Sequence, residues 1–312
     1  MPDLNPRSRS GRAHRLITTA EGSQTGSFGL LDWALLVGVA LIWGSSYLFI
    51  DIALESLAPP VIAWARSLLG FLALAVLPMA RRRIDRADLG RMVLLGLTWV
   101  AIPFVLFPLA QRSIDSALAG MFNALVPIWS AVIAALLIRT LPRLRLVVGV
   151  ALGFIGALLI GYPVASGSEA EAWGVVLVVV ATLLYGFSLN TAVPLTQRYG
   201  SPALLMWALG IAAALLTPVG LMSIPQSSLR VSSAISILVL GVLNTGGGYV
   251  LMAALVGRVG STRGSVSIYL LPLVATLLGV TFRNETVVLL QLAGMGLVLL
   301  GAWLSSRRIQ PE

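Results

Sequence analysis

Two residues that a hydrocarbon environment disfavours lie inside one long apolar stretch of this 312-residue chain. The segment SALAGMFNALVPIWSAVIAAL, residues 116–136, carries Asn123 and Pro127 near its middle. A buried amide needs a hydrogen-bond partner, and a proline removes one backbone bond from a helix, which costs about 3 kcal/mol in soluble helices. The carbonyl that the proline leaves free is tolerated where it meets a water-filled cavity or another helix. The segment therefore predicts either a cavity wall or a packing kink.

The same feature recurs in a second apolar stretch. The segment VSIYLLPLVATL, residues 266–277, carries Pro272, with Tyr269 one helical turn before it. Because the feature occurs twice, we predict that Pro127 and Pro272 act as conformational hinges in two corresponding cavity walls. The alternative is a pair of packing kinks that neighbouring helices satisfy.

Aromatic and hydroxyl side chains recur at helical spacing in other apolar stretches. Trp43 and Ser46 share one helix face, and Tyr185 opens a similar pattern later in the chain. Small-molecule pockets are mostly apolar with a few placed polar groups, although the same residue types also serve ordinary helix packing. We predict a substrate-binding set of eight residues: Trp43, Ser46, Trp99, Asn123, Tyr185, Asn244, Tyr249 and Tyr269.

One charge, Arg66, lies well inside an apolar stretch, about six residues or roughly 9 Å from its end. An ionisable residue inside a membrane is a functional-site hypothesis by default. However, Asp51 and Glu55 end the adjoining stretch on the same side. Two interpretations stay open, namely a structural charge pair across this hairpin and a charge that faces the substrate.

The residues that most enzymes need are missing from the apolar stretches. The chain has no cysteine, and its one histidine, His14, precedes the first stretch. No carboxylate falls in the middle of a stretch. We therefore expect no metal, no cofactor and no enzymatic activity. The alternatives are an intramembrane lipid-modifying enzyme, which would need a catalytic constellation, and a structural membrane protein, which would not need matched prolines.

Composition places these residues in a membrane. The chain is 58% hydrophobic and only 11% charged, against about 25% charged in a soluble protein. Its apolar residues form ten blocks of a length that crosses a bilayer. The expected fold class is an all-α polytopic membrane protein with spans near 32–54, 60–80, 88–110, 116–138, 144–162, 174–195, 202–222, 234–256, 262–282 and 286–305.

The basic residues predict how these spans are oriented. All 21 are arginines; with the N-terminus inside, 17 fall on inner segments and three, Arg112, Arg230 and Arg283, on outer loops. This bias predicts that both termini are cytoplasmic. The net charge of +9 does not indicate nucleic-acid binding, because the charges form no continuous soluble face. We expect residues 1–31 to be a disordered cytoplasmic tail rather than a cleaved signal peptide, and 306–312 a second tail.

The two halves of the chain repeat each other. A shift of 145 residues places Gly96 on Gly241 and Pro127 on Pro272, and a shift of 142 places Trp43 on Tyr185. Because five spans are an odd number, the halves 32–162 and 174–305 would cross the membrane in opposite directions. Such inverted repeats are typical of secondary transporters.

Three segments carry a resemblance to a known family: WGSSYLFIDIALESLAPPVIAWARSLLGF (43–71), ALAGMFNALVPIWSAVIAALL (117–137) and SVSIYLLPLVATLLGVTFRNETVVLLQLAGMGLVLLGAWL (265–304). They resemble the EamA-domain, ten-helix exporters of the drug/metabolite transporter superfamily. The resemblance implies an inner-membrane location and export of small metabolites, amino acids or drugs through a central cavity. One family glutamate is present as Glu285, whereas its first-half counterpart is Thr140.

The expected partners are a small-molecule substrate and the lipid bilayer. Glycines in the fifth and tenth spans, among them Gly149, Gly156, Gly294 and Gly301, suit close helix contact, either within the chain or at a subunit interface. We expect a monomer or a weak homodimer.

Overall fold

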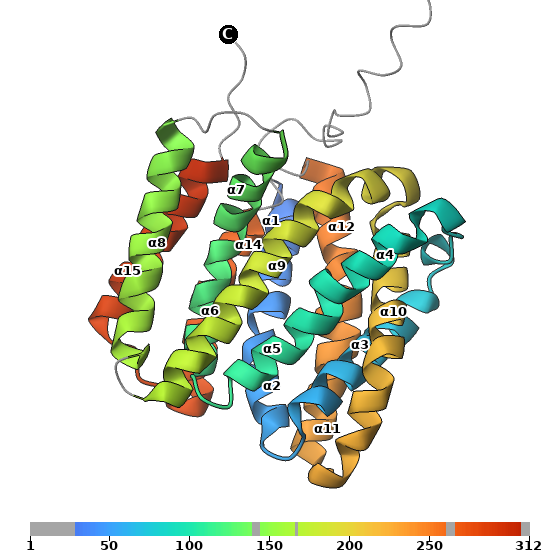
Figure 1. Cartoon of the computed structure of the whole chain (residues 1–312), viewed down its shortest axis with the longest axis horizontal. Helices are drawn as coiled ribbons and strands as arrows, with labels where there is room; N and C mark the ends of the chain where they lie inside the picture. The colour runs from blue at the N-terminus through green and yellow to red at the C-terminus, as the bar shows by residue number, and fades with distance from the viewer. Residues whose placement is uncertain (1–28, 139–143, 166–167, 260–265, 307–312) are drawn as a thin grey trace, which may run out of the picture.

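The computed structural model describes residues 29–138, 144–165, 168–259 and 266–306, and within these ranges the chain is helical without a β-strand. The predicted all-α class is therefore confirmed for the described residues. The predicted tails fall almost wholly outside them, as does Thr140. We call the end of the bundle where α1 begins and α15 ends the terminal end, at the top of Figure 1, and the opposite end the far end.

Within the described residues, each predicted span overlaps a helical segment. Six helical segments are long and apolar enough to cross a membrane, and four shorter ones are apolar. In chain order the elements are α1 (Leu30–Gly44), α2 (Ser46–Leu54), α3 (Pro59–Ala75), η2 (Pro78–Ala80), η3 (Arg86–Asp88), α4 (Leu89–Leu95), η4 (Gly96–Ala101), α5 (Ile102–Ala110), α6 (Ser116–Phe122), η5 (Asn123–Leu125), α7 (Val126–Ile138), α8 (Leu144–Ala165), α9 (Glu169–Tyr199), α10 (Ser201–Met222), η6 (Ile224–Gln226), α11 (Val231–Leu238), η7 (Val239–Gly247), α12 (Gly248–Val259), α14 (Val266–Arg283) and α15 (Leu289–Ser306).

Two segments have the wider turns of a π-helix. They are η4 in the predicted third span and η7 in the predicted eighth span. A Cβ on Gly96 would lie 3.2 Å from the carbonyl oxygen of Ala208, and one on Gly241 would lie 3.3 Å from that of Arg66. Each π-segment therefore packs a glycine against another helix backbone. π-turns inside α-helices are frequent at functional sites.

The two predicted hinge prolines have different surroundings. Pro127 follows the 3₁₀ turn η5, which divides the predicted fourth span into α6 and α7. Pro127 lacks the N–H that would bond the carbonyl of Asn123, and a tighter turn is a common way to meet that loss. Pro272, in contrast, lies inside α14, which continues as one α-helix on both sides of it. The local structure at the two prolines is therefore not the same.

Helices at corresponding positions of the two halves make corresponding contacts. The helix α3 packs on α10 and on η7, while α10 packs on α3 and on η4. Likewise α1 packs on α14, and α9 packs on α7. The helices α8 and α15 pack on each other at one edge of the bundle, on the left of Figure 1.

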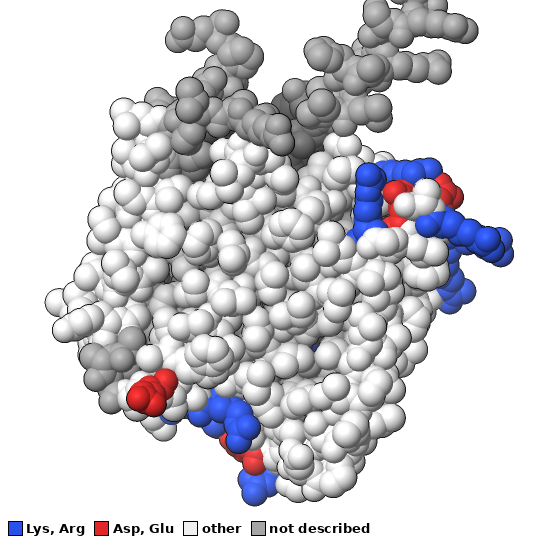
Figure 2. Space-filling view, in the orientation of Figure 1, with Lys and Arg blue, Asp and Glu red and all other residues white. Residues whose placement is uncertain are grey.

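The surface has the character of a membrane protein. Large apolar side chains such as Leu158 and Leu277 are 70% and 65% exposed. In Figure 2 the charged side chains gather near the two ends of the face shown, with an uncharged region between them. This pattern matches a bundle whose sides face hydrocarbon and whose ends face water.

Candidate functional site

A cavity of about 470 Å³ lies in the centre of the bundle. Its wall takes residues from helices of both halves of the chain. Seven of the eight predicted substrate-binding residues line it: Trp43, Ser46, Trp99, Asn123, Tyr185, Asn244 and Tyr249. The lining reaches the terminal end of the bundle at Thr196, Ser201 and Pro202, where α9 ends and α10 begins.

Tyr269 does not belong to this cavity. Its hydroxyl donates to the carbonyl oxygen of Ala302 on α15, at 3.2 Å. The residues of α14 that do line the cavity are Ile268 and Leu271, on the neighbouring side of the helix. In this structure the side chain of Tyr269 therefore packs between α14 and α15, and its role in substrate binding stays a prediction.

Three aromatic rings form one side of the cavity. The ring of Tyr249 meets that of Trp43 edge-on at 5.4 Å and that of Trp99 at 6.4 Å between centroids. The indole N–H of Trp43 donates to the carbonyl oxygen of Asn244 at 3.1 Å. A Cβ on Gly248 would overlap this indole, so a glycine at that position lets Trp43 lie against the start of α12.

A second aromatic set forms another part of the cavity wall. The ring of Phe107 stacks on Tyr185 at 5.8 Å and meets Tyr47 edge-on at 5.6 Å. Neither Tyr47 nor Phe107 is among the predicted substrate-binding residues. Tyr47 could have been found, because it lies four residues after Trp43 and three before Ile50, on the same helix face.

Two amide oxygens in the cavity wall have no hydrogen-bond partner in the described residues. They are Oδ1 of Asn123 and Oδ1 of Asn244. The amide nitrogen of Asn244 is held, since it donates to the carbonyl of Ile42 and to Oγ of Ser45. An unsatisfied buried acceptor costs about 1–3 kcal/mol, so both oxygens are suited to receive a donor from water or a solute.

The structure corrects the predicted pairing of Arg66 with Asp51 and Glu55. Both carboxylates instead form ion pairs with Arg283, at the end of α14, at 2.6 Å in the case of Glu55. Arg66 lines the central cavity, where its Nε donates to Oγ1 of Thr245 at 3.1 Å. Its guanidinium carbon lies 4.1 Å above the ring of Phe104. Placing an arginine at the centre of a membrane helix costs about 2.5–3.5 kcal/mol on insertion scales. Because charges inside a membrane are costly and rare, this position favours a functional role for Arg66.

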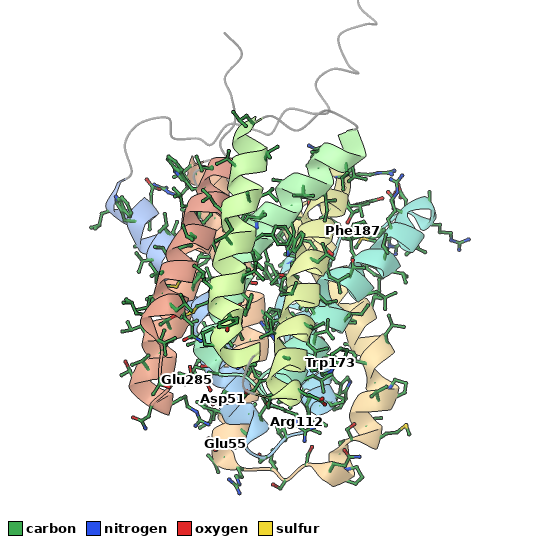
Figure 3. The ribbon with its side chains drawn as sticks, turned by 60° about the vertical axis from the view of Figure 1, so that its left-hand side comes forward. Asp51, Glu55, Arg112, Trp173, Phe187 and Glu285 are labelled. Atoms are coloured by element: carbon green, nitrogen blue, oxygen red, sulfur yellow. The ribbon has the colours of Figure 1, made fainter. Side chains whose placement is uncertain are left out.

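Polar contacts at the far end join distant parts of the chain. Oε1 of Glu285 accepts hydrogen bonds from the backbone N–H and the hydroxyl of Ser116, at 2.9 and 2.6 Å. Its Oε2 accepts from the N–H of Ala117 at 2.8 Å. Figure 3 shows Glu285 together with Asp51 and Glu55 at this end.

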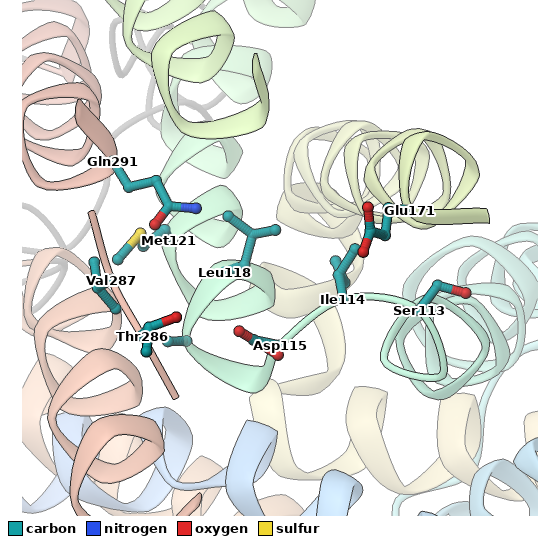
Figure 4. Close-up of a pocket in the computed structure, with 10 residues that line it drawn as sticks. Ser113, Ile114, Asp115, Leu118, Met121, Glu171, Thr286, Val287 and Gln291 are labelled. Carbon is teal, nitrogen blue, oxygen red and sulfur yellow. The ribbon is translucent and has the colours of Figure 1, made fainter. Parts of the chain in front are cut away.

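A smaller pocket of about 80 Å³ opens beside these contacts (Figure 4). Ser113, Asp115, Glu171, Thr286 and Gln291 contribute its polar groups. Burial, and next the nearby carboxylate of Glu285, raises the pKa of Asp115 above its ordinary value of 3.8. In the described part of the chain, no group of three histidine or acidic side chains is arranged to hold a metal ion.

Ion pairs also join helices at the terminal end. Nε of Arg258 on α12 lies 2.6 Å from Oδ1 of Asp32 on α1. Arg198, near the end of α9, pairs with Asp85 and with Asp88, in the second case at 2.6 Å. These contacts lie at the edge of the bundle rather than among the residues that line the cavity.

The chain is similar to known transporters along most of its length. It shares 28% identity with an uncharacterised transporter of Archaeoglobus fulgidus, over 88% of this chain and 99% of that protein. It shares 26% identity with a probable terminal-alkyne amino-acid exporter of Streptantibioticus cattleyicolor, over 88% of this chain and 93% of that protein. A solved crystal structure matches with a TM-score of 0.62 at 16% identity, over 88% of this chain and 95% of that one, which supports the fold alone.

A family model matches the chain twice, at residues 32–162 and 172–307. Its description is the EamA-like transporter family. Together with the helical bundle and its central cavity, these matches show that the chain is a membrane-embedded member of the EamA-like transporter family.

Proposed function

We propose that this protein is a secondary transporter that exports small amphipathic metabolites across the cytoplasmic membrane. The observation that carries the proposal is the cavity of about 470 Å³ between the two halves, with an aromatic wall and few polar groups. Such a lining suits organic solutes rather than multivalent ions. The relative from Streptantibioticus cattleyicolor is named as an amino-acid exporter, which makes amino acids the first substrates to test.

The matched contacts support an architecture of ten spans in two inverted repeats. A Cβ on Gly96 would lie 3.1 Å from Cβ of Ile211, and one on Gly241 would meet the side chain of Leu69. Leu69 and Ile211 are 142 residues apart, which is the same shift that places Trp43 on Tyr185. Gly96 belongs to the π-segment η4 and Gly241 to the π-segment η7, so a π-segment makes this contact in each half. In this architecture each half packs its second span on the third span of the other half.

The two ends of the cavity support alternating access. At the terminal end the lining continues to the junction of α9 and α10. Toward the far end, we infer that the stacked rings of Phe107 and Tyr185 and the ion pairs of Arg283 close the path. We infer a state in which the cavity communicates with the terminal side, which the arginine distribution assigns to the cytoplasm. Pro127 and Pro272 remain the proposed hinges between this state and one open to the other side.

The protein acts in this proposal as a monomer or weak homodimer without a cofactor. The glycine faces of α8 and α15 meet each other within one chain, where Gly156 and Gly294 are in contact. They therefore supply no glycine face for a second subunit. The family and the names of the relatives favour transport over catalysis.

Flux measurements in inside-out vesicles test the proposal. A panel of amino acids and amphipathic drugs is offered with and without a pH gradient, and we expect accumulation of at least one compound class that depends on the intact cavity. The matched control is the variant Trp99→Ala, which alters the cavity wall and should accumulate less of the compound when its folding is verified. Absence of flux for every compound, in a verified folded sample, would overturn the transport function.

Orientation has its own test because the chain contains no cysteine. Single cysteines are introduced at Arg112, at the far end, and at Arg86, in the segment between α3 and α4. A membrane-impermeant maleimide should label Cys at position 112 in intact cells and position 86 only in inside-out vesicles. The reverse pattern would overturn the proposed orientation.

A further inference from the structure

The central cavity contains a cation, Arg66, that has no carboxylate partner among the described residues. In the described residues every ion pair uses an arginine other than Arg66. The side chain of Arg66 makes one hydrogen bond there, from Nε to Thr245, so both terminal guanidinium nitrogens are left without a hydrogen-bond acceptor. Arginine offers five donors in a planar fork that matches a carboxylate.

The residues around Arg66 fix its position. Oγ1 of Thr245, which accepts the bond from Arg66, itself donates to the carbonyl oxygen of Leu240 at 2.7 Å. Thr245 is 1% exposed and belongs to the π-segment η7. The ring of Phe104 lies against one face of the guanidinium. The fork is therefore held on two sides, while its remaining donors are available to a ligand in the cavity that Arg66 lines.

Three tyrosines add uncharged donors near this cation. Tyr47, Tyr185 and Tyr249 line the same cavity as Arg66. Within the described part of the chain, their hydroxyls have no protein hydrogen-bond partner, although many other hydroxyls of the cavity helices do. A tyrosine hydroxyl can donate to an oxyanion, and one arginine with neutral donors matches a single negative charge.

From this arrangement we propose that Arg66, together with the hydroxyls of Tyr47, Tyr185 and Tyr249, binds the carboxylate of the transported solute. The substrate class is an amphipathic monocarboxylate, whose apolar body lies against Trp43 and Trp99. The inference rests on the proposed transport function, and it adds the group that recognises the head of the solute. The charge belongs to one half only, because the position that corresponds to Arg66 is Ala208. A bound solute therefore has one preferred orientation in an otherwise matched cavity.

Ligand-induced thermal stabilisation tests this site independently of transport, because a ligand that binds the folded state raises its melting temperature. The purified full chain is heated with matched pairs of probes: butanoate, hexanoate and 3-phenylpropanoate, each against its neutral amide. We expect the acids, and most strongly 3-phenylpropanoate, to stabilise the wild-type protein more than their amides. Arg66→Gln should reduce acid affinity about tenfold to hundredfold, the usual size of a lost charged hydrogen bond, and leave amide affinity unchanged.

Three further variants keep the test decisive. Arg112→Gln removes an exposed arginine outside the cavity and should behave as the wild type. Thr245→Val leaves the charge but removes the acceptor that holds it, so the preference for acids should weaken. Arg66→Lys keeps a cation without the fork and should keep part of the preference, which covers the case in which Arg66→Gln does not fold.

The outcomes separate this site from the transport function. Equal stabilisation by acids and amides, no stabilisation by either, or an acid preference that survives Arg66→Gln would overturn the carboxylate site, whatever the flux measurements give. An acid preference that depends on Arg66 in a protein without flux would support the site and overturn the transport function.

Discussion

The carboxylate of Glu285 caps the first turn of a helix that begins 169 residues earlier, at Ser116. The first N–H groups of a helix lack partners inside the helix, and a negative charge there is also favoured by the helix dipole. The local residue in the capping position, Asp115, makes no such bond with its side chain. The cap of α6 is therefore supplied by the segment between α14 and α15, and the two segments are tied together at the far end.

Removal of this cap should destabilise the bundle. We expect Glu285→Ala to cost about 1–2 kcal/mol, the usual cost of a lost helix cap, and to lower the melting temperature in detergent. Glu171→Gln, at the start of α9, is the control for loss of a far-end charge. An unchanged melting temperature for Glu285→Ala would contradict the cap.

Gly279 gives a sharper form of the same test. A Cβ at this position would lie 2.8 Å from Cδ of Glu285, which is closer than real contacts allow. Gly279→Ala should therefore destabilise the wild-type protein but cost much less when Glu285 is already alanine. The four melting temperatures of this double-mutant cycle measure the coupling. Additive costs would mean that the two residues do not share this space.

The residues of the cavity were largely predictable from sequence because helical periodicity and the internal repeat both point to them. Trp43, Tyr185 and Asn123 lie on faces that a spacing of three and four defines locally. The partner of Arg66 was not predictable in the same way. Sequence proximity favoured Asp51 and Glu55, yet both carboxylates are taken by Arg283, which is more than 200 residues away.

The π-segments and the glutamate cap were missed for a related physical reason. A π-turn widens a helix without a local residue signature, and in η4 it accompanies the contact between Gly96 and the α10 backbone. Similarly, nothing near Ser116 in the sequence indicates that Glu285 will cap it. Features that depend on which distant segments meet need the tertiary structure, whereas features set within one helix do not.

The ion pairs of Arg283 should control opening at the far end. Arg283→Gln would leave Asp51 and Glu55 without their cation and favour a state in which they separate from α14. A cysteine in place of Ile50, in the far half of the cavity, should then react faster with an impermeant maleimide added from the far side. A conformational coupling of about 1–3 kcal/mol would change the population of the open state, and with it the labelling rate, by about fivefold to 150-fold.

A reciprocal reporter distinguishes opening from general loosening of the bundle. A cysteine in place of Ser201, in the lining at the terminal end, should become less reactive from the terminal side in Arg283→Gln. Arg112→Gln serves as the control for loss of a far-end arginine. If both reporters became faster, the ion pairs would stabilise the fold rather than select between two states.

The raised pKa of Asp115 makes stability depend on pH. Because the folded protein holds this proton more tightly than the unfolded chain, the contribution of Asp115 is favourable at acidic pH and is lost as pH rises through the raised value. Asp115→Asn removes this dependence and keeps a residue that suits a helix start. We compare the melting temperatures of Asp115→Asn and the wild type at about pH 4 and about pH 7, because both values lie above the ordinary pKa of 3.8 for Asp115. The melting temperature of the variant minus that of the wild type should increase from the lower pH to the higher one. A constant difference across this range would show that the carboxyl group is not perturbed.

The contact between α8 and α15 predicts opposite effects for two glycines on one helix. A Cβ on Gly294 would lie 2.6 Å from the carbonyl oxygen of Gly156 and 3.0 Å from the backbone nitrogen of Ile160, whereas a Cβ on Gly296 would meet nothing within 4 Å. Gly294→Ala must therefore push two backbones apart, and we expect it to cost about 1–3 kcal/mol. Gly296→Ala should be neutral or stabilising by up to about 1 kcal/mol, because alanine favours a helix.

Melting temperatures of the two variants, measured side by side in the same detergent, test this difference with an identical chemical change. Gly156→Ala tests the other side of the contact, since its Cβ would lie 2.6 Å from the carbonyl oxygen of Gly294. It should resemble Gly294→Ala, and the two together should cost less than their sum, because the first substitution already separates the helices. Equal effects of Gly294→Ala and Gly296→Ala would mean that α8 and α15 are not in backbone contact at this point, and their glycine faces would then be free for a second subunit.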